Sequence, residues 1–350
     1  MGEPEAPPPH AGERLTREDV LRLIGEHGGP EGLDLSERNL READLSGLDL
    51  HEANLSWAKL EGADLRGANL QGAHLWRADS HGARLYEANL QRANLYEANL
   101  QGANLSHANL QGAYLRSANL QAANLRVANL RGADVSDANL QGGDLRWAGL
   151  GGADISHANL QGADLRRADL RRASLADASL RDANLDGARW GDYKLGEESE
   201  GKFREAFSVY RALKQQHTEA GMYEIAGEFF YREMEARRKL SRQKRHLPHA
   251  LSMYSLRFLY GYGERPERVI GSATVIILGL AIVHWLLGTV AGGFVEALYY
   301  SAVSFTALGY GQWAAEPQGW AGRFLGVGEA LMGVFMMALF LVTFTRKMTR

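Results

Sequence analysis

Leucine recurs at every fifth residue along the first half of the chain. At positions 35, 40, 45 and onward to 190 the residue is leucine, with four exceptions, Ser80, Val135, Ile155 and Trp190. Alanine stands two residues before most of these positions, and aspartate or asparagine usually stands one residue before. The other two positions of each unit are mostly polar. A strict period of five is thus the dominant pattern of hydrophobic and polar positions.

Neither an α-helix nor a flat strand can keep this leucine column on one face. Five helical steps advance about 500°, so the column would wind around the helix axis. An odd period in a strand would place alternate leucines on opposite faces. The pattern therefore predicts a solenoid whose chain turns a corner every five residues, each side sending one leucine and one alanine inward. We expect aspartate and asparagine at the corners, because both residues tolerate tight turns.

These units resemble the pentapeptide-repeat family, whose units read A(D/N)LxG, as in ANLQGANLSHANLQGAYL at residues 98–115. The resemblance implies a right-handed quadrilateral β-helix over residues 31–195, with four pentapeptides in each coil. Some family members imitate DNA with a strongly acidic outer face. The outward positions here tilt towards basic residues, so we expect a surface for docking an unknown protein. The net charge of -3 argues against nucleic-acid binding.

Both flanks of the repeat region have distinct patterns. Residues 1–14 are rich in proline, glycine and glutamate and are expected to be disordered. Residues 15–29 predict a short helix that starts after Thr16, with Asp19 completing the cap, and that covers the open end of the solenoid. Residues 200–266 predict a helical coupler containing two helices. Its basic run, ARRKLSRQKRH, is expected to meet anionic lipid headgroups.

Two apolar segments, residues 269–290 and 322–345, are long enough to span a bilayer. The first contains His284 as its only ionisable residue, and beyond Arg323 the second contains only Glu329. Basic residues precede the first segment and follow the second. The positive-inside rule then places both termini and the solenoid in the cytoplasm. We expect a multi-pass protein of the prokaryotic plasma (inner) membrane.

The stretch FVEALYYSAVSFTALGYGQW lies between the two apolar segments. A half-helix over residues 294–306, followed by extended chain over residues 307–311, is what a re-entrant pore loop requires. Glycine on both sides of Tyr310 lets successive carbonyls point at one axis. Such carbonyls replace the water around a dehydrated cation.

From about residue 268 to the C-terminus, this arrangement resembles the two-transmembrane potassium channels. The resemblance implies a homotetramer with K⁺ as the permeant ion and no other cofactor. The implied filter residues are Thr306, Ala307, Leu308, Gly309, Tyr310 and Gly311, with K⁺ held by the carbonyls of Ala307, Leu308, Gly309 and Tyr310. The implied supports of the filter are Ser301, Ser304, Gln312 and Glu329. Gly333 falls where such channels often have a gating hinge.

Two residues depart from the potassium-channel pattern. Ala307 stands where the family usually has a threonine whose hydroxyl binds the innermost ion, and Gln312 replaces a usual acidic residue. A poorly selective cation channel and a non-conducting, membrane-anchored scaffold are therefore alternatives. Glu329 is interpreted either as a carboxylate hydrogen-bonded behind the filter or as a proton site that gates the channel.

Several other motifs receive simpler interpretations. An earlier Gly-Tyr-Gly at residues 261–263 lacks a preceding half-helix and is predicted to be a turn near the membrane interface. His284 is predicted to be a packed or interfacial residue rather than a metal ligand, because no second ligand lies at helical spacing from it. Gly322 and Gly326 predict a close helix-packing face. The chain contains no cysteine, no Ser, His and Asp arrangement and no phosphate loop, so an enzyme is not expected.

Overall fold

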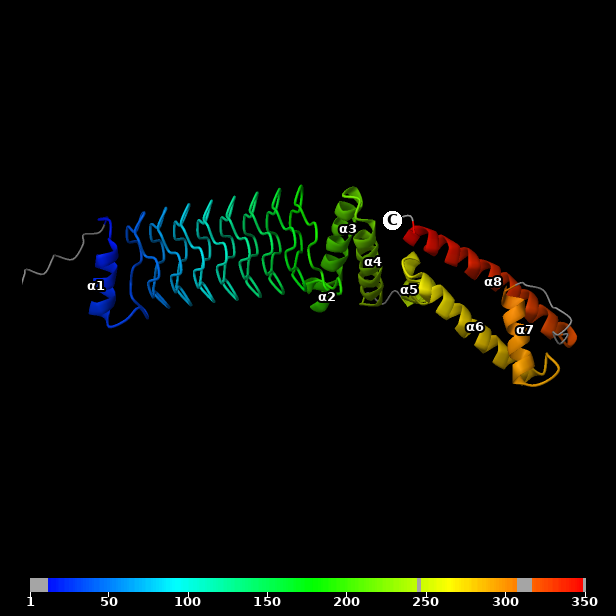
Figure 1. The fold of residues 1–350 in the computed structure, drawn as a ribbon. Coiled ribbons are helices and arrows are strands. Elements are labelled where there is room, and N and C mark those ends of the chain that lie inside the picture. The colour runs from blue at the N-terminus through cyan, green and yellow to red at the C-terminus, as the bar shows by residue number, and fades with distance from the viewer. Residues whose placement is uncertain (1–11, 244–246, 307–316, 349–350) are drawn as a thin grey trace, which may run out of the picture. The chain divides into compact units, whose positions relative to one another are not determined.

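The structure is a computed structural model that describes residues 12–243, 247–306 and 317–348. The chain forms two compact units, and the boundary between Val209 and Tyr210 falls inside helix α3. The first unit contains helix α1, a long stack of coils and the short helix α2, whereas the second unit is mainly helical (Figure 1). We describe each unit by itself.

Helix α1, Arg17–His27, precedes the coils and has the cap expected from its sequence. The Thr16 side chain accepts a hydrogen bond from the Asp19 backbone, and the Asp19 carboxylate accepts one from the Thr16 backbone N–H. Gly28 ends the helix in the left-handed conformation, with φ of 85°. Val20 is fully buried. A parallel bridge between Arg14 and Asn39 continues the backbone ladder of the coils up to the start of α1.

Successive coils are joined by parallel β-bridges whose partners are 20 residues apart, from Asp34 with Asn54 to Asp169 with Arg189. Each coil therefore contains four five-residue units. The Leu35 N–H donates to the Asn54 carbonyl at 2.8 Å, and this pattern repeats along the stack. Within the described coils the bridges are isolated and separated by turns, without continuous strands. The periodicity of the sequence thus corresponds to a solenoid of short sides.

The interior of the coils is filled by the leucine and alanine columns. The residues at every fifth position from Leu35 to Leu170 are at most 1% exposed. Ser80 interrupts the leucine column and is also buried, and its hydroxyl has no hydrogen-bond partner among the described residues. Because all side chains inside the coils are otherwise apolar and small, the solenoid has a continuous dry core.

The corners of the coils are not where the sequence interpretation placed them. The residue two positions after each leucine adopts positive φ, for example Glu37 at 59°, Val127 at 61° and Gly132 at 63°. This conformation favours glycine, which explains why glycine recurs at this outward position. The expectation that aspartate and asparagine occupy the corners was wrong, because those residues form the bridges.

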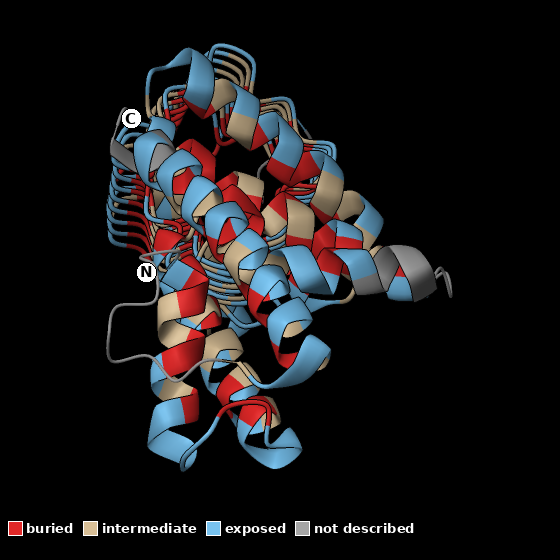
Figure 2. Cartoon of the chain, turned by 90° about the vertical axis from the view of Figure 1, so that its right-hand side faces the viewer, coloured by how far each residue is buried: buried red, intermediate tan, exposed pale blue. Residues whose placement is uncertain are grey.

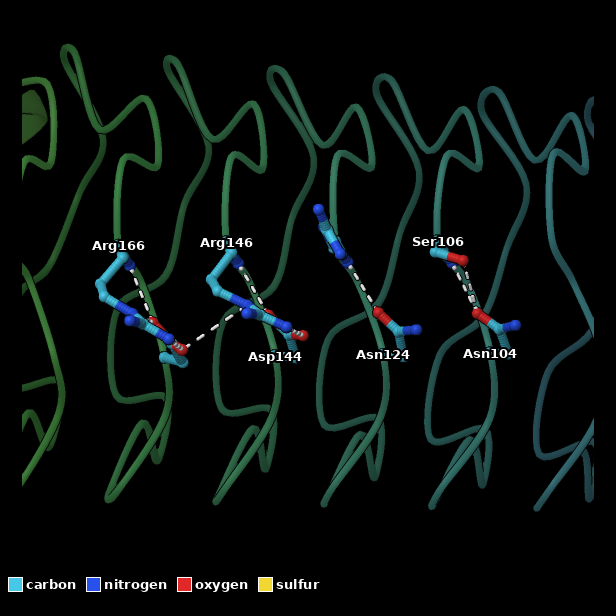
Figure 3. Close-up of polar contacts among 8 residues, drawn as sticks. Asn104, Ser106, Asn124, Asp144, Arg146 and Arg166 are labelled. Carbon is cyan, nitrogen blue, oxygen red and sulfur yellow. Dashed lines mark hydrogen bonds and ion pairs between the residues drawn. The ribbon is translucent and has the colours of Figure 1, made fainter.

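The aspartate and asparagine side chains instead brace the turn that follows them. The backbone N–H of Ser106 donates to Asn104 Oδ1 at 3.1 Å, and that of Arg146 donates to Asp144 Oδ1 at 3.1 Å (Figure 3). On another side of the solenoid, asparagines stack in a ladder, with Asn109 Nδ2 donating to Asn89 Oδ1 at 3.4 Å. The short polar side chain therefore satisfies a turn N–H and links neighbouring coils.

A buried carboxylate ends the backbone ladder. In a regular coil the N–H of Ile155 donates to the carbonyl of Ser174 at 2.9 Å. Leu175 has no further coil beside it, and its N–H donates to Glu197 Oε1 at 2.5 Å. Glu197 belongs to α2, Gly196–Ser199, and is 1% exposed. Burial raises the pKa of this carboxyl group.

Three helices precede the membrane segments. Helix α3, Phe203–Glu219, and helix α4, Tyr223–Gln243, form the hairpin expected from the sequence, with the Tyr210 and Phe229 rings 6.3 Å apart. Helix α5, Leu247–Tyr260, follows and was not anticipated as a separate helix. The short 3₁₀ turn η1, Gly261–Gly263, then leads into α6. The earlier Gly-Tyr-Gly is therefore a turn, as predicted.

The last three helices are α6, Pro266–Leu287, α7, Phe294–Thr306, and α8, Gly319–Met348. Helix α7 contacts both α6 and α8. Pro266–Leu287 and Gly319–Thr345 have the length and apolar composition of membrane spans, and only 22% of the most apolar stretch of each is buried within the chain. Many of the large apolar residues in these helices are exposed, and Figure 2 shows exposed residues in pale blue along the helices that face the viewer. Such exposure suits helices that face lipid or further subunits.

Candidate ion-conduction site

Helix α7 ends directly before the predicted filter. Residues 307–311 and Gln312, on which most of the filter prediction falls, lie outside the described residues. Thr306 is the last residue of α7, is exposed, and donates a hydrogen bond from its hydroxyl to the Ala302 carbonyl at 2.8 Å. The C-terminal end of a helix carries a partial negative charge. The end of α7 therefore favours a cation close to the start of this loop.

Helix α8 approaches the end of α7 very closely at Gly333. A Cβ atom on Gly333 would overlap the carbonyl oxygen of Phe305. No side chain larger than hydrogen fits this contact unless one of the helices moves. The sequence interpretation assigned Gly333 to a gating hinge. The contact supplies a second physical reason for glycine, namely close packing of α8 against the pore helix.

A buried polar cluster lies between α6, α7 and α8. Glu329 on α8 is 1% exposed, and its Oε1 lies 3.0 Å from the hydroxyl of Ser301 on α7. The same hydroxyl lies 3.0 Å from the carbonyl of Ile277 on α6. Ser304, which is also buried, hydrogen-bonds the Glu329 carboxylate. The structure thus brings together three of the four residues that the sequence analysis named as filter supports.

His284 is a fourth member of this cluster, and sequence reasoning missed it. Its ring is fully buried, and Nε2 lies 3.4 Å from Glu329 Oε1. Nδ1 lies 2.6 Å from the Thr289 hydroxyl, and the ring packs edge-on against Tyr300 at 5.0 Å. A signal was present in the sequence, because each apolar segment contains one deeply placed ionisable residue and such residues usually pair with each other.

Small residues on α8 allow its N-terminal half to pack closely. Gly322 and Gly326 are both buried. A Cβ on Gly322 would lie 2.9 Å from the carbonyl oxygen of Thr289. An antiparallel bridge between Val290 and Pro317 joins the two chain segments that flank the α7 region. The neighbours of Gly322 are Thr289 and Pro317, which lie outside the helices, so the helix-packing face expected from Gly322 and Gly326 stays a prediction.

A network of charged and aromatic side chains joins α4 to α5 and to η1, the turn that leads into α6. The Tyr262 hydroxyl donates to Glu235 Oε1 on α4 at 3.1 Å. Arg238 and Arg257 each pair with the Glu235 carboxylate at 3.0 Å. Tyr262 adopts a φ of 60°, which turns its side chain back onto α4. Burial raises the pKa of the Tyr262 hydroxyl, and the charge of Glu235 adds to this effect.

The same network contacts the start of α6. Arg268 donates to the Arg257 carbonyl at 3.1 Å, and its guanidinium lies 5.5 Å from the Tyr231 ring centroid. Arg265 pairs with Glu228 of α4 at 2.6 Å. Movement of α4 would therefore be transmitted to the first apolar helix through several hydrogen bonds and ion pairs. We call the contacts of Glu235, Tyr262, Arg238 and Arg257 the α4–α6 latch, because they join α4 to the helix and the turn that lead into α6.

The latch changes the interpretation of the basic run at residues 236–246. Arg238 in this run is 6% exposed, and its guanidinium is held by Glu235 and by the Tyr254 ring at 4.2 Å. At least this arginine serves packing within the helical unit, whereas the run as a whole was expected to face lipid headgroups.

One group of possible metal ligands lies on the solenoid. Ligand atoms of Glu61, Asp79 and His81 all lie within 4.8 Å of one another. Arg41 forms an ion pair with Glu61, and His81 Nδ1 lies 3.1 Å from Asp79 Oδ1. Because these contacts already use the acidic groups, we assign no metal to this cluster.

Two family models match the chain. A model of pentapeptide repeats, with eight copies, covers residues 31–187 in overlapping segments. A model described as an ion channel covers residues 271–350, the region of α6, α7 and α8. A comparison with curated proteins gave no match.

Similar solved structures are pentapeptide-repeat proteins. HetL, which is involved in heterocyst differentiation regulation in the cyanobacterium Nostoc sp. strain PCC 7120, is 34% identical over 52% of this chain and 100% of its own, with a TM-score of 0.34. A second pentapeptide-repeat protein from Nostoc PCC 7120 is 34% identical over 33% of this chain and 87% of its own, with a TM-score of 0.22.

The full-length plasmid-mediated fluoroquinolone resistance protein QnrB1 is 20% identical over 42% of this chain and 86% of its own, with a TM-score of 0.21. These TM-scores are low, so the family assignment is based on the sequence matches. Through residues 31–187 the chain belongs to the pentapeptide-repeat family, and over residues 271–350 it carries an ion-channel domain.

Proposed function

We propose that four copies of this chain form a potassium-selective channel. The observation that carries the proposal is the packing of α7 against two apolar helices of membrane-spanning length, inside the ion-channel domain and directly before Ala-Leu-Gly-Tyr-Gly. One chain provides one quarter of a ring of carbonyls, so the proposal requires a tetramer. Potassium is the permeant ion, and no other cofactor is proposed.

In this proposal the carbonyls of Ala307, Leu308, Gly309 and Tyr310 hold K⁺, with Thr306 and Gly311 at the ends of the filter. The buried cluster of Ser301, Ser304 and Glu329 supports the position of α7, and Gln312 braces the filter from the other side. His284 extends this support to α6, because it contacts Glu329. Gly333 acts first as a packing contact with Phe305 and secondarily as a hinge.

Reversal potentials of the reconstituted full chain in asymmetric K⁺ and Na⁺ test the proposal. A reversal potential close to the K⁺ equilibrium potential supports potassium selectivity. A value near zero would favour the poorly selective cation channel that Ala307 and Gln312 leave open. Liposomes that stay impermeable to both ions would favour the membrane-anchored scaffold. Tyr310→Ala provides the control, because it disrupts the proposed filter outside the membrane-spanning helices.

We further propose that the pentapeptide repeats form a right-handed quadrilateral β-helix in the cytoplasm of a prokaryote. The spacing of 20 residues between bridged positions supports four sides for each coil. Basic residues before the first and after the second apolar segment support cytoplasmic termini in the plasma (inner) membrane. The solenoid would dock an unknown protein, and no nucleic acid is proposed as a partner.

The α4–α6 latch is the proposed route by which the cytoplasmic part influences the pore. Glu235 accepts from Tyr262 and pairs with two arginines, so Glu235→Gln removes one charge and weakens three contacts. We expect the open probability of the reconstituted channel to change at least threefold, with unchanged ion selectivity. Glu219→Gln on α3 is the matched control, because the Glu219 carboxylate accepts a hydrogen bond from Gln215 of its own helix and forms no ion pair with any residue that the structure describes. Equal open probabilities for the two variants would remove the latch from the proposal.

A further inference from the structure

One corner of the last coils of the solenoid is hollowed into a notch of about 490 Å³. The residues that line it come from four successive coils, and all belong to the first unit. They are Arg131, Gly151, Gly152, Arg171, Arg172, Gly191 and Asp192. We call this hollow the arginine notch.

The notch exists because glycine replaces a long side chain at one outward position. Residues 20 apart stack along the solenoid, and at this position Gln71, Gln91 and Gln111 are followed by Arg131 and then Gly151. Gly151 leaves a gap in a surface that glutamine covers in the earlier coils. The Arg131 side chain leans over this gap, since its Nε lies 3.9 Å from the place where a Cβ on Gly151 would be.

Three arginines and one aspartate line the notch. Arg171 is held in place by Asp169, with its Nε 2.7 Å from Oδ1 and a terminal nitrogen 2.5 Å from Oδ2. Arg131 and Arg172 are both exposed, and neither forms an ion pair with any residue that the structure describes. Asp192 accepts a hydrogen bond from the Lys194 backbone N–H at 3.1 Å. Two cations therefore face the notch without a neutralising partner.

We propose that the arginine notch binds an oxyanion of the phosphate monoester class. Coils stack at roughly 4.8 Å, so the backbones of Arg131 and Arg171 are separated by about 10 Å. A phosphate group that enters between them can accept hydrogen bonds from guanidinium groups on both sides, at the short distances of charge-assisted pairs. The planar guanidinium group can donate two parallel hydrogen bonds to two oxygens of one tetrahedral phosphate. Gly151 and Gly152 supply the space that such a group requires.

The phosphate could be that of a soluble ion or of a lipid headgroup, and two ligands distinguish these sources. The full chain in detergent micelles is titrated with inorganic phosphate and, separately, with dihexanoyl phosphatidic acid, and binding is measured by isothermal titration calorimetry. Dihexanoyl phosphatidylcholine, a zwitterionic diester, is the lipid control. Binding of inorganic phosphate as tight as that of phosphatidic acid indicates a soluble ligand, whereas binding of phosphatidic acid alone indicates a lipid headgroup.

Two variants test the site from opposite directions. Arg131→Gln with Arg172→Gln removes the two unpaired cations. Gly151→Gln keeps all arginines and fills the gap with the residue that earlier coils carry, at a position where a Cβ meets only ordinary contacts. Both variants are expected to weaken binding at least tenfold. Arg84→Gln with Arg126→Gln makes the same charge change elsewhere on the solenoid and is expected to bind as the wild type does.

The proposal fails if the wild type binds neither phosphate compound, or if binding is unchanged when the gap is filled by Gly151→Gln. An equal loss in the control pair would also overturn it, because the binding would then follow the overall charge of the solenoid. Circular dichroism of each variant checks that the coils are intact. None of these outcomes depends on whether the channel conducts.

Discussion

The solenoid and the helical unit with the apolar segments differ in what they bury. Inside the coils almost every buried side chain is leucine or alanine, and the same few hydrogen bonds recur from coil to coil. Between α6, α7 and α8 the structure buries His284, Ser301 and Glu329, each with its own partners. Stability in the coils is therefore divided among many equivalent contacts. In the helical unit each contact contributes a larger share of the stability. Substitutions there should therefore have larger effects on stability and on ion flux.

The largest effect is expected for Gly333→Ala. The added Cβ would overlap the Phe305 carbonyl oxygen, so α8 and the end of α7 must separate. We expect loss of K⁺ flux in liposomes and a lower melting temperature. Gly328→Ala on the same helix is the control, because its Cβ meets nothing within 4 Å. If Gly333→Ala melts as the wild type does and changes only open probability, the packing role of Gly333 is wrong and the hinge interpretation is favoured.

Glu329 gives the next largest effect. Glu329→Ala leaves buried His284 without its Glu329 partner and opens a cavity, which should lower the free energy of unfolding by about 2 to 3 kcal/mol. Glu329→Gln retains a hydrogen-bond acceptor for Ser301 and should cost less. Thermal unfolding of both variants in detergent measures the loss of stability in each.

Glu329→Gln also decides between the two interpretations of Glu329. A gating proton site requires a titrating group, which Glu329→Gln removes. If currents of this variant keep the pH dependence of the wild type, Glu329 serves only as a hydrogen-bonded support of α7. If the dependence disappears while the melting temperature is retained, Glu329 is the proton site.

The repeated contacts of the solenoid were easier to predict from the sequence than the individual contacts of the helical unit. The solenoid was predictable because Leu100 and Leu120 occupy the same environment, so the repeat displays one structural rule many times. The positive-φ corner was also visible, since glycine recurs at residues 62, 67 and 72. It was missed because aspartate and asparagine commonly occupy turns. In this solenoid they precede the turn, and their side chains accept hydrogen bonds from N–H groups within it.

The candidate site was predictable only in part. Ser301 and Ser304 were named because a family pattern placed them, and Glu329 because a carboxylate in an apolar segment needs a hydrogen-bonding partner; the structure brings the three together. His284 was dismissed because the search for its partner followed helical spacing within one segment, whereas its partner lies on another helix. The latch between Glu235 and Tyr262 was likewise not predictable, because it joins residues 27 positions apart through a turn whose geometry no local pattern specifies.

In the solenoid, Ser80→Leu should stabilise the protein. Ser80 buries a hydroxyl without a partner in a column that otherwise contains leucine. Removing the unpaired hydroxyl and adding buried apolar surface should raise the free energy of unfolding by about 2 kcal/mol. Ser80→Ala separates the two contributions, because it removes the hydroxyl without filling the column. Denaturant unfolding followed by circular dichroism provides the measurement, and a destabilised Ser80→Leu would mean that the column has no room there.

Val127→Gly should give a smaller gain. Val127 is an exposed β-branched residue with φ of 61°, a conformation that costs a side-chain-bearing residue about 1 to 2 kcal/mol. Glycine removes this strain but loses more backbone entropy on folding, which costs about 0.5 to 1 kcal/mol. The net gain should therefore be about 0.5 to 1 kcal/mol. Gly132 occupies the equivalent corner of the next five-residue unit. Gly132→Val should therefore lower the free energy of unfolding by a similar amount in the same assay.

The smallest effect is expected for Asp164→Asn, and its sign depends on pH. The hydrogen bond from Arg166 lowers the pKa of Asp164 below 3.8, so the ionised carboxylate stabilises the fold above that value and this contribution is lost as pH falls through the folded-state pKa. Asparagine keeps the acceptor for the turn N–H, as Asn104 and Asn124 do, and loses only the charge. An exposed ion pair contributes less than about 1 kcal/mol, so the variant should be slightly less stable at neutral pH. The stabilities of the two proteins should converge as the pH falls through the folded-state pKa of Asp164, because the wild-type carboxylate then becomes protonated in both the folded and unfolded states. A difference that persists unchanged in acid would show that the carboxylate charge is not what Asp164 contributes.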